Sequence, residues 1–240
     1  MRLVNQWHMD MVYNWLKLHH TCRLCQGRHR ADSPFCPDCM ASLPWLERAC
    51  SRCGMPVQVA GNADCGHCQQ LQPWFDRCQA LFQYQAPLPH LVQQFKFHAR
   101  LDILRLLGRI MAAEFARLDP ADRPQALLPV PLHGRRLRWR GFNQALELAR
   151  PIARRLQIPI ETKLVRRTRA TREQSHLKPI ERRRNVKHAF SLQRDIGYRH
   201  LVIIDDVVTT AHTVNELSRV LKLAGVERVD IWCLCRAGGH

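Results

Sequence analysis

Four C-x-x-C pairs restrict what the N-terminal part of this chain can fold into. They lie between positions 22 and 68, as Cys22/Cys25, Cys36/Cys39, Cys50/Cys53 and Cys65/Cys68. One such pair places two thiolates on one metal ion, and two pairs complete a tetrahedral four-cysteine zinc site. The eight cysteines therefore predict two Zn2+ sites. The pairs can combine in sequence, or interleave so that the first joins the third and the second joins the fourth.

Two other uses of these cysteines are less consistent with the sequence. A disulfide framework needs an oxidising compartment, and the first 20 residues lack the apolar block and cleavage site of a signal peptide, which favours a cytoplasmic protein. A redox role does not explain four copies of the motif. A closed all-cysteine site leaves no coordination position open, so we predict structural zinc whose binding supplies much of this region's folding free energy.

Residues 201–213 predict a phosphate site at the end of a buried strand. The segment reads LVIIDDVVTTAHT, with Asp205 and Asp206 following an apolar run that is typical of a parallel strand. Two adjacent carboxylates at a buried strand end are costly unless they have a partner or a ligand. The hydroxyl residues that follow open a predicted helix, where Thr213 and Glu216 fit a capping box. Helix N-terminal N–H groups bind anions, so the pattern suits a phosphate beside vicinal hydroxyls, as in ribose 5-phosphate.

Strand and helix patterns alternate over the rest of the chain. We expect a strand, a proline-marked turn and the start of a helix over 80–97. Further strands are expected over 126–132, 160–166, 200–205 and 228–235, and helices over 103–118, 142–157 and 214–224. This order predicts a parallel sheet with flanking helices and with ligands at the carboxyl ends of the strands. The predicted domains are an N-terminal helix (1–20), a double zinc ribbon (21–76) and an α/β domain (77–240). The apolar runs are shorter than the ~20 residues that span a bilayer.

The positive charge is concentrated in the middle of the chain. The net charge is +17, and residues 81–200 carry 25 basic and 9 acidic side chains. Such clustering favours an anionic ligand, either nucleic acid or a small polyphosphate, over an ordinary solvated surface. The basic turn after Pro129–Leu132 contains Arg135 and Arg136, and residues 167–187 form a long basic loop. Lys96, between two phenylalanines, is either a partly buried helix residue or a cation at a nucleic-acid site.

Several motifs together resemble one known family. The Asp205–Thr213 segment resembles the signature of type I phosphoribosyltransferases. The PVPL segment before His133 and the RGFNQA segment at 140–145 resemble the ComF/GntX proteins of competence and DNA utilisation. The loop residues of the R-x3-T-x2-Q-x2-L-x4-R-x2-N pattern and the double zinc ribbon match that family as well; the pattern residues are Arg167, Thr171, Gln174, Leu177, Arg182 and Asn185.

The resemblance implies roles for individual residues. Asp205 and Asp206 would hold the ribose hydroxyls of phosphoribosyl pyrophosphate (PRPP), and Arg135 and Arg136 its pyrophosphate, with Mg2+ bound alongside. The 5-phosphate would be wrapped by Thr209, Thr210, Ala211, His212 and Thr213. Ala211 departs from the family pattern, in which glycine is usual, and a positive φ angle there would strain the loop.

The resemblance also implies a biological role. It points to DNA uptake or utilisation, with single-stranded DNA or a nucleotide bound near a ribose-phosphate site and a helicase-type partner. The alternative is an active phosphoribosyltransferase whose acceptor is a nucleotide-related compound. In that case the 167–187 loop would close over the site and exclude water.

Overall fold

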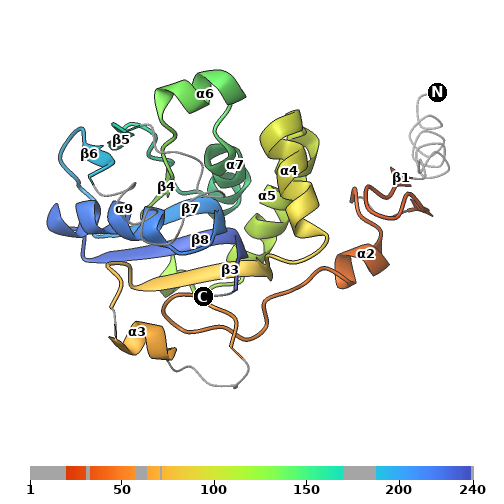
Figure 1. Ribbon diagram of the computed structural model, residues 1–240, viewed down its shortest axis with the longest axis horizontal. Coiled ribbons are helices and arrows are strands. Elements are labelled where there is room, and N and C mark those ends of the chain that lie inside the picture. Colours follow the sequence, from red (N-terminus) through yellow and green to blue (C-terminus); the bar gives the residue numbers. More distant parts are fainter. Residues whose placement is uncertain (1–19, 31–32, 58–63, 71, 170–187, 239–240) are drawn as a thin grey trace, which may run out of the picture. The chain divides into compact units, whose positions relative to one another are not determined.

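The computed structural model describes residues 20–30, 33–57, 64–70, 72–169 and 188–238 (Figure 1). The chain forms two compact units, Met1–Leu43 and Pro44–His240. The predicted N-terminal helix lies outside the described residues except for His20, which begins strand β1 (His20–Thr21). The first unit also contains β2 (Arg28–His29), which pairs with β1 in antiparallel fashion, and helix α2 (Pro37–Ala41).

A four-stranded parallel sheet forms the centre of the second unit. Its strands are β3 (Arg77–Gln83), β8 (Arg228–Arg236), β7 (His200–Val208) and β4 (Ala126–Pro129), in that spatial order. Every neighbouring pair is parallel. Helices cover both faces of such a sheet, which is why β7 and β8 read as continuous apolar runs. The predicted α/β class with a parallel sheet is confirmed.

Alternate side chains of the sheet enter two different cores. On one face, Ile231 packs in a cluster with Leu217 of α9 (His212–Leu223). On the other face, the neighbouring Trp232 stacks on Phe115 of α5 (Leu101–Phe115), with ring centroids 4.3 Å apart. This period-2 alternation is the normal consequence of strand geometry.

The second face is covered by a helical layer. Helix α5 packs against α4 (Leu88–His98) and α7 (Gln144–Leu156), and α7 also contacts β4 and β7. Gly108 makes the α5–α7 approach possible, because a Cβ atom there would lie 3.1 Å from the Pro151 ring. The described part of the unit also contains α3 (Gly66–Gln70), the short 3-10 helix η1 (Pro120–Asp122) and an antiparallel pair, β5 (Val165–Arg167) with β6 (Phe190–Leu192).

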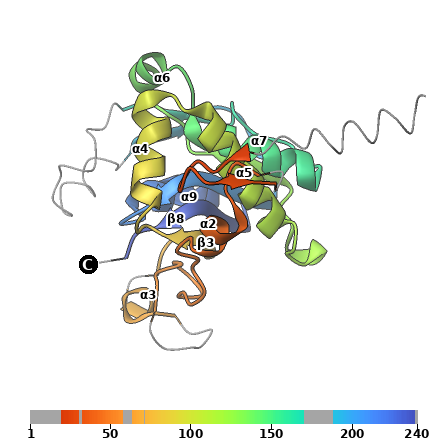
Figure 2. The ribbon, with the colours of Figure 1, turned by 90° about the vertical axis from the view of Figure 1, so that its right-hand side faces the viewer.

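The segment after β4 differs from the sequence-based expectation. It was predicted as a basic turn, but it forms helix α6 (Gly134–Arg140), which lies beside α4 in Figures 1 and 2. The His133 imidazole accepts a hydrogen bond from the Arg135 backbone N–H and so caps the helix start. Gly141 ends the helix in the left-handed conformation at φ +79°. Arginine and leucine are good helix formers, so the sequence between these two ends supports about two turns of helix.

Two further expectations have clear outcomes. The described residues contain no helix that is both long and apolar enough to cross a membrane. The basic loop predicted over 167–187 falls outside the described residues, apart from its first three residues and its boundary at β5. Its predicted closure over the site therefore has no structural counterpart among the described residues.

Candidate functional site

The carboxylate pair lies near the carboxyl end of strand β7, which is longer than the sequence predicts. Strand β7 continues to Val208 because it pairs with β8 up to Arg236, so Asp205 and Asp206 are strand residues. Adjacent strand residues point to opposite faces, and the two carboxylates therefore meet different neighbours. The Asp206 backbone N–H donates to Asp205 Oδ1 at 2.9 Å, which ties the two together.

Asp206 forms an ion pair that the sequence did not predict. Its Oδ2 lies 2.5 Å from Lys96 Nζ of α4, and its side chain is only 4% exposed. The Lys96 side chain is 22% exposed, so its ammonium is also largely removed from water. Lys96 is a partly buried helix residue, one of the two readings of the sequence. It supplies the partner that a buried carboxylate requires.

Asp205 has a different electrostatic environment. Burial raises the pKa of Asp205 well above the ordinary carboxyl value, and the charge of Asp206 adds to this, while Lys96 acts in the opposite direction. Asp205 also interacts electrostatically with Arg167 of β5. Burial and the charge of Arg136 together lower the pKa of Arg167 to about 10, while Asp205 acts against this shift. A cation or a hydroxyl donor bound at Asp205 would therefore stabilise the charged form of this carboxyl group.

The predicted phosphate loop follows β7 directly. It comprises Thr209–Ala211, and α9 begins at His212, earlier than the capping-box prediction placed it. The Thr213/Glu216 capping box is wrong: Glu216 Oε1 accepts from the His188 backbone N–H at 2.9 Å, and the Glu216 carboxylate also pairs with Arg219. Within the described residues, the Thr210 hydroxyl is buried without a hydrogen-bond partner. An orphaned hydroxyl at a helix N-terminus fits an anion ligand.

The predicted pyrophosphate arginines lie on helix α6 rather than in a turn. Arg136 is half-buried and close enough to Arg167 to affect its pKa. Arg135 is exposed and forms no ion pair among the described residues. The structure therefore brings Arg136, Arg167 and Asp205 into one electrostatic cluster, and leaves Arg135 on the surface.

The eight paired cysteines form two separate clusters. The first contains Cys22, Cys25, Cys36 and Cys39, the second Cys50, Cys53, Cys65 and Cys68, and within each the sulfur atoms lie within 4.8 Å of one another. Sequential pairing is therefore correct, and the interleaved arrangement is excluded.

The geometry of both clusters fits zinc. The Cys25–Cys36 and Cys53–Cys65 sulfur atoms are 3.8 Å and 3.7 Å apart, the edge expected of a tetrahedron with Zn–S bonds of about 2.3 Å. Burial alone would raise the pKa of the Cys22 thiol, but backbone N–H donors lower it to about 6. The same balance brings the pKa of Cys50 to about 7. Thiolates stabilised in this way are ready metal ligands, and a closed four-cysteine set gives a structural site.

Comparisons with known proteins agree with both parts of the chain. A double zinc ribbon domain model matches residues 15–69, and a phosphoribosyl transferase domain model matches residues 143–240. DNA utilization protein YhgH of Escherichia coli (strain K12) is 36% identical over 218 residues, which cover 90% of this chain and 89% of that protein. Competence protein F of Haemophilus influenzae is 35% identical over 226 residues, covering 90% and 96%. The chain belongs to the ComF/GntX family.

The chain is also similar to proteins of lower sequence identity. Competence protein ComFC of Bacillus subtilis is 26% identical over 202 residues, covering 80% of this chain and 79% of that protein. A solved glutamine PRPP amidotransferase from B. subtilis covers 59% of this ComF-family chain and 30% of its own, with 19% identity and a TM-score of 0.39. The family assignment rests on the closely similar full-length relatives, and it confirms the resemblance seen in the motifs.

In this ComF-family chain, a buried arginine joins the second cysteine cluster to the phosphate loop. Arg236, only 2% exposed, ends strand β8. Its Nε donates to the Cys53 carbonyl at 2.9 Å, and its Nη1 donates to the carbonyls of Val208 (3.0 Å), Thr209 and Ala237 (2.9 Å). Sequence analysis missed Arg236, and it did not predict the pairing of Lys96 with Asp206. The only local signal for Arg236 is a single charge at the end of an apolar strand.

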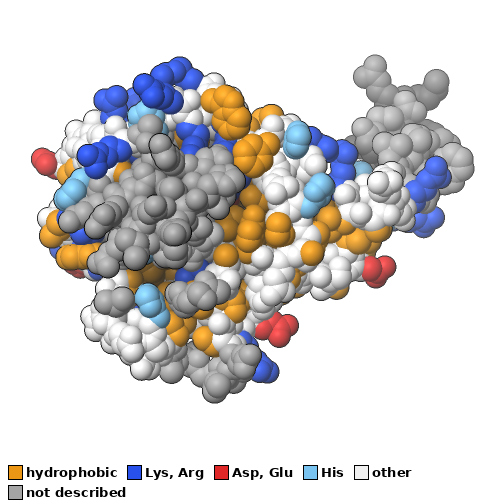
Figure 3. All heavy atoms as spheres, viewed as in Figure 1, with side chains coloured by type: hydrophobic (Ala, Val, Ile, Leu, Met, Phe, Trp, Pro, Cys, Tyr) orange, Lys and Arg blue, Asp and Glu red, His pale blue; other side chains and the backbone are white. Residues whose placement is uncertain are grey.

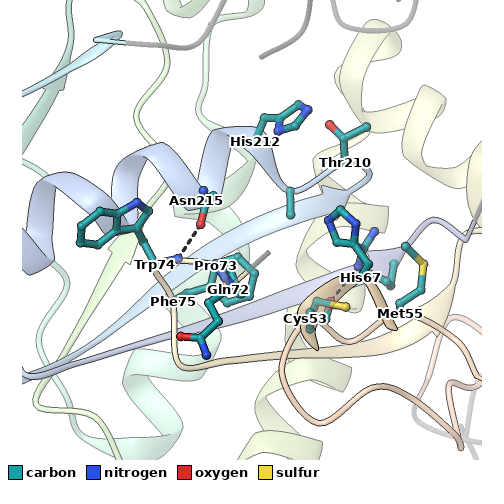
Figure 4. A pocket seen from close by; sticks show the side chains of 13 residues that line it. Cys53, Met55, His67, Gln72, Pro73, Trp74, Phe75, Thr210, His212 and Asn215 are labelled. Carbon is teal, nitrogen blue, oxygen red and sulfur yellow. Dashed lines mark hydrogen bonds between the residues drawn. The ribbon is translucent and has the colours of Figure 1, made fainter. Parts of the chain in front are cut away.

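A pocket lies between the second cysteine cluster and the start of α9 (Figure 4). It has a volume of about 250 Å³. The Trp74 backbone N–H donates to Asn215 Oδ1 at 2.7 Å and fixes the segment before β3 against α9. Thr210, Ala211 and His212 line this pocket, so the phosphate loop has the cluster on one side. The second cysteine cluster is thus a neighbour of this loop, and Arg236 connects the two.

The conformation of Ala211 gives a first prediction. Its φ angle is +59°, in the left-handed region, where a residue with a Cβ atom is strained by roughly 1–2 kcal/mol. We expect Ala211→Gly to raise the free energy of unfolding by about 0.5–1 kcal/mol, because the relief of strain exceeds the extra chain entropy of glycine. Denaturant unfolding measures this. A matched Ala224→Gly change, at a position with φ −92°, should be neutral or destabilising; equal stabilisation by both would contradict the assignment of strain to Ala211.

Proposed function

We propose that this protein acts in DNA uptake or utilisation, with a ribose-phosphate site at the carboxyl end of β7. The names of its relatives, DNA utilization protein and competence protein, support the biological role. The observation that carries the site is the arrangement of Asp205 and Asp206 beside the Thr209–Thr213 loop. Lys96 pairs with Asp206, and Arg167 and Asp205 influence each other electrostatically. Carboxylates for hydroxyls and N–H donors for a phosphate are the groups that a ribose 5-phosphate requires.

PRPP with Mg2+ is the ligand we propose for this site. Mg2+ binds through one or two carboxylates and substrate phosphates, and the raised pKa of Asp205 is consistent with a carboxyl that lacks a strong cationic partner. In this proposal the chain orients the ribose through Asp205 and Asp206. Arg136 and Arg135 offset the negative charge of the pyrophosphate. The 5-phosphate is held by the loop, where the Thr210 hydroxyl has no protein partner among the described residues.

Isothermal titration with PRPP and Mg2+ tests the proposal. The wild-type protein should bind, and Asp205→Asn should weaken binding about tenfold or more, since charge-assisted hydrogen bonds contribute roughly 1.5–3 kcal/mol. Glu227→Gln removes an exposed carboxylate elsewhere and should leave the affinity unchanged. Absence of binding by the wild-type protein would refute the ribose-phosphate site.

The stability of the same variant separates loss of function from loss of fold. Because the pKa of Asp205 is raised in the folded state, ionising it costs stability as the pH rises from the unfolded value, near 4, through the folded pKa. Asparagine has no such cost and can still accept the Asp206 N–H bond. We therefore expect Asp205→Asn to be more stable than wild type at pH 7, with the gain vanishing below about pH 4. Thermal unfolding across this range measures the effect, and a gain that persists at low pH would contradict it.

Transfer of the phosphoribosyl group to a nucleotide-related acceptor is the alternative. The feature that favours it is the cluster of Arg136 and Arg167 at the site, because positioned cations stabilise a leaving pyrophosphate. This alternative predicts release of pyrophosphate when PRPP and an acceptor are both present. The proposed DNA role instead predicts that PRPP binds without being turned over. We include a helicase-type protein partner in that role.

A further inference from the structure

Two exposed aromatic side chains from different helices meet on the surface near the carboxylate pair. Phe97, near the end of α4, is 51% exposed, and Trp139, near the end of α6, is 67% exposed. Their ring centroids are 6.3 Å apart at an interplanar angle of 66°. A large apolar side chain that remains this exposed adds little to folding, so the pair marks a surface with another use.

Four arginines share helix α6 with Trp139. Helix α6 has the sequence GRRLRWR, which places Arg135, Arg136, Arg138 and Arg140 within one short helix that contains no acidic residue. Among the described residues, Arg135 and Arg138 are exposed and form no ion pair. Figure 3 shows Lys and Arg side chains gathered over α6, with exposed hydrophobic side chains beside them toward α4. We call Phe97, Trp139 and these four arginines the aromatic–arginine platform.

The platform is connected to the proposed ribose-phosphate site through both of its helices. On α4, Lys96 pairs with Asp206 while the next residue, Phe97, contacts Trp139. On α6, Arg136 acts electrostatically on Arg167 beside Asp205. Helices α4 and α6 therefore contribute residues both to the platform and to the proposed site.

We propose that the aromatic–arginine platform binds single-stranded DNA by stacking bases on Trp139 and Phe97, an inference that rests on the proposed role in DNA handling. Aromatic faces that accept any base, together with arginines that contact phosphates, are the combination by which proteins hold single strands without sequence preference. Duplex DNA offers no free base faces, so it can use only the arginines. An exposed tryptophan with guanidinium groups around it has charge complementarity with a nucleic acid strand.

The experiment measures fluorescence anisotropy of a labelled oligothymidine of about 20 nucleotides, a length that exceeds one binding site. We expect Trp139→Ala to weaken binding about tenfold, the scale of one stacking contact. Trp139→Phe should retain most of the affinity, because it keeps an aromatic face. Leu223→Ala removes a different exposed apolar side chain, 66% exposed, and should have no effect.

Salt dependence and an abasic strand separate stacking from charge. For an abasic oligomer of the same length, wild type and Trp139→Ala should bind equally, because no base is present to stack. Arg138→Ala should lower the slope of log affinity against log salt by about 0.7, whereas Trp139→Ala should leave the slope unchanged. Equal losses on both oligomers, or a Trp139→Ala affinity within twofold of wild type, would overturn the proposal.

Two additional measurements distinguish this proposal from others. If Trp139→Ala loses binding to anionic lipid vesicles but not to oligothymidine, the platform is a membrane surface and the proposal fails. Titration with PRPP and Mg2+ should give the same affinity for Trp139→Ala and wild type. If Trp139→Ala weakens oligothymidine binding but the wild-type protein does not bind PRPP, only the ribose-phosphate site is refuted. If the wild-type protein binds PRPP but Trp139→Ala does not weaken oligothymidine binding, only the platform is refuted.

Discussion

Replacing Cys53 by serine is expected to remove about one zinc ion per chain and to weaken PRPP binding at least tenfold, while Cys25→Ser removes one zinc without changing that affinity. The two variants are matched, since each breaks one four-cysteine cluster. They differ in position, because Cys25 belongs to the first compact unit and Cys53 contacts the arginine that holds the phosphate loop. Metal analysis and PRPP titration on the same preparations measure both effects.

The physical reason for this difference is the hydrogen-bond set of Arg236. Its guanidinium joins the Cys53 carbonyl to the carbonyls of Val208 and Thr209, at the point where β7 becomes the loop. Structural zinc contributes folding free energy of about 10 kcal/mol or more in small domains, so its loss should release the Cys53 segment and one end of this connection. The loop would then lose the support that fixes its donors.

A second variant tests the connection without removing metal. Arg236→Leu should retain both zinc ions and still lose PRPP affinity. It should also lower the free energy of unfolding by about 3 kcal/mol or more, because several buried carbonyls are left without a donor. Unchanged affinity in Arg236→Leu, or equal losses in Cys53→Ser and Cys25→Ser, would show that the second cluster does not support the loop.

The features that sequence analysis predicted correctly are those encoded within short segments. The C-x-x-C spacing predicts two four-cysteine sites, although it does not determine which pairs combine, and the apolar run before Asp205 predicts the buried strand that carries this residue. Lys96 and Arg236 could not be predicted in the same way. Their contacts join segments far apart in the chain, 183 positions in the case of Arg236 and Cys53. Only the folded topology brings such groups together.

Helix α6 shows a second reason for the difference. The glycine at 134 and the preceding prolines favour a turn, and a stretch of only seven residues has no long periodic pattern to indicate a helix. Because α6 was predicted as a turn, Trp139 was not expected to face Phe97. The sequence identified the basic character of this segment, and the structure determined which aromatic side chain lies among the arginines.

Removing the partner of Asp206 should have a large effect on stability. We expect Lys96→Met to lower the free energy of unfolding by about 3 kcal/mol, because it leaves a carboxylate that is 4% exposed without a compensating cation. The double variant Lys96→Met/Asp206→Asn should recover most of this loss, since it removes the uncompensated charge along with its partner. Denaturant unfolding of both single variants and the double variant gives the coupling energy.

A matched lysine elsewhere in the unit separates this ion pair from ordinary surface pairs. Lys222 Nζ lies 2.6 Å from Asp76 Oδ2, at a distance close to that of the Lys96 pair, but the Asp76 side chain is 44% exposed. Water can solvate Asp76 when its partner is lost, so Lys222→Met should cost no more than about 1 kcal/mol. If the two lysine variants lose the same stability, burial of Asp206 is not what makes Lys96 necessary. If Lys96→Met alone is strongly destabilising, the Asp206 carboxylate depends on Lys96 of α4 for its charge balance in the folded protein.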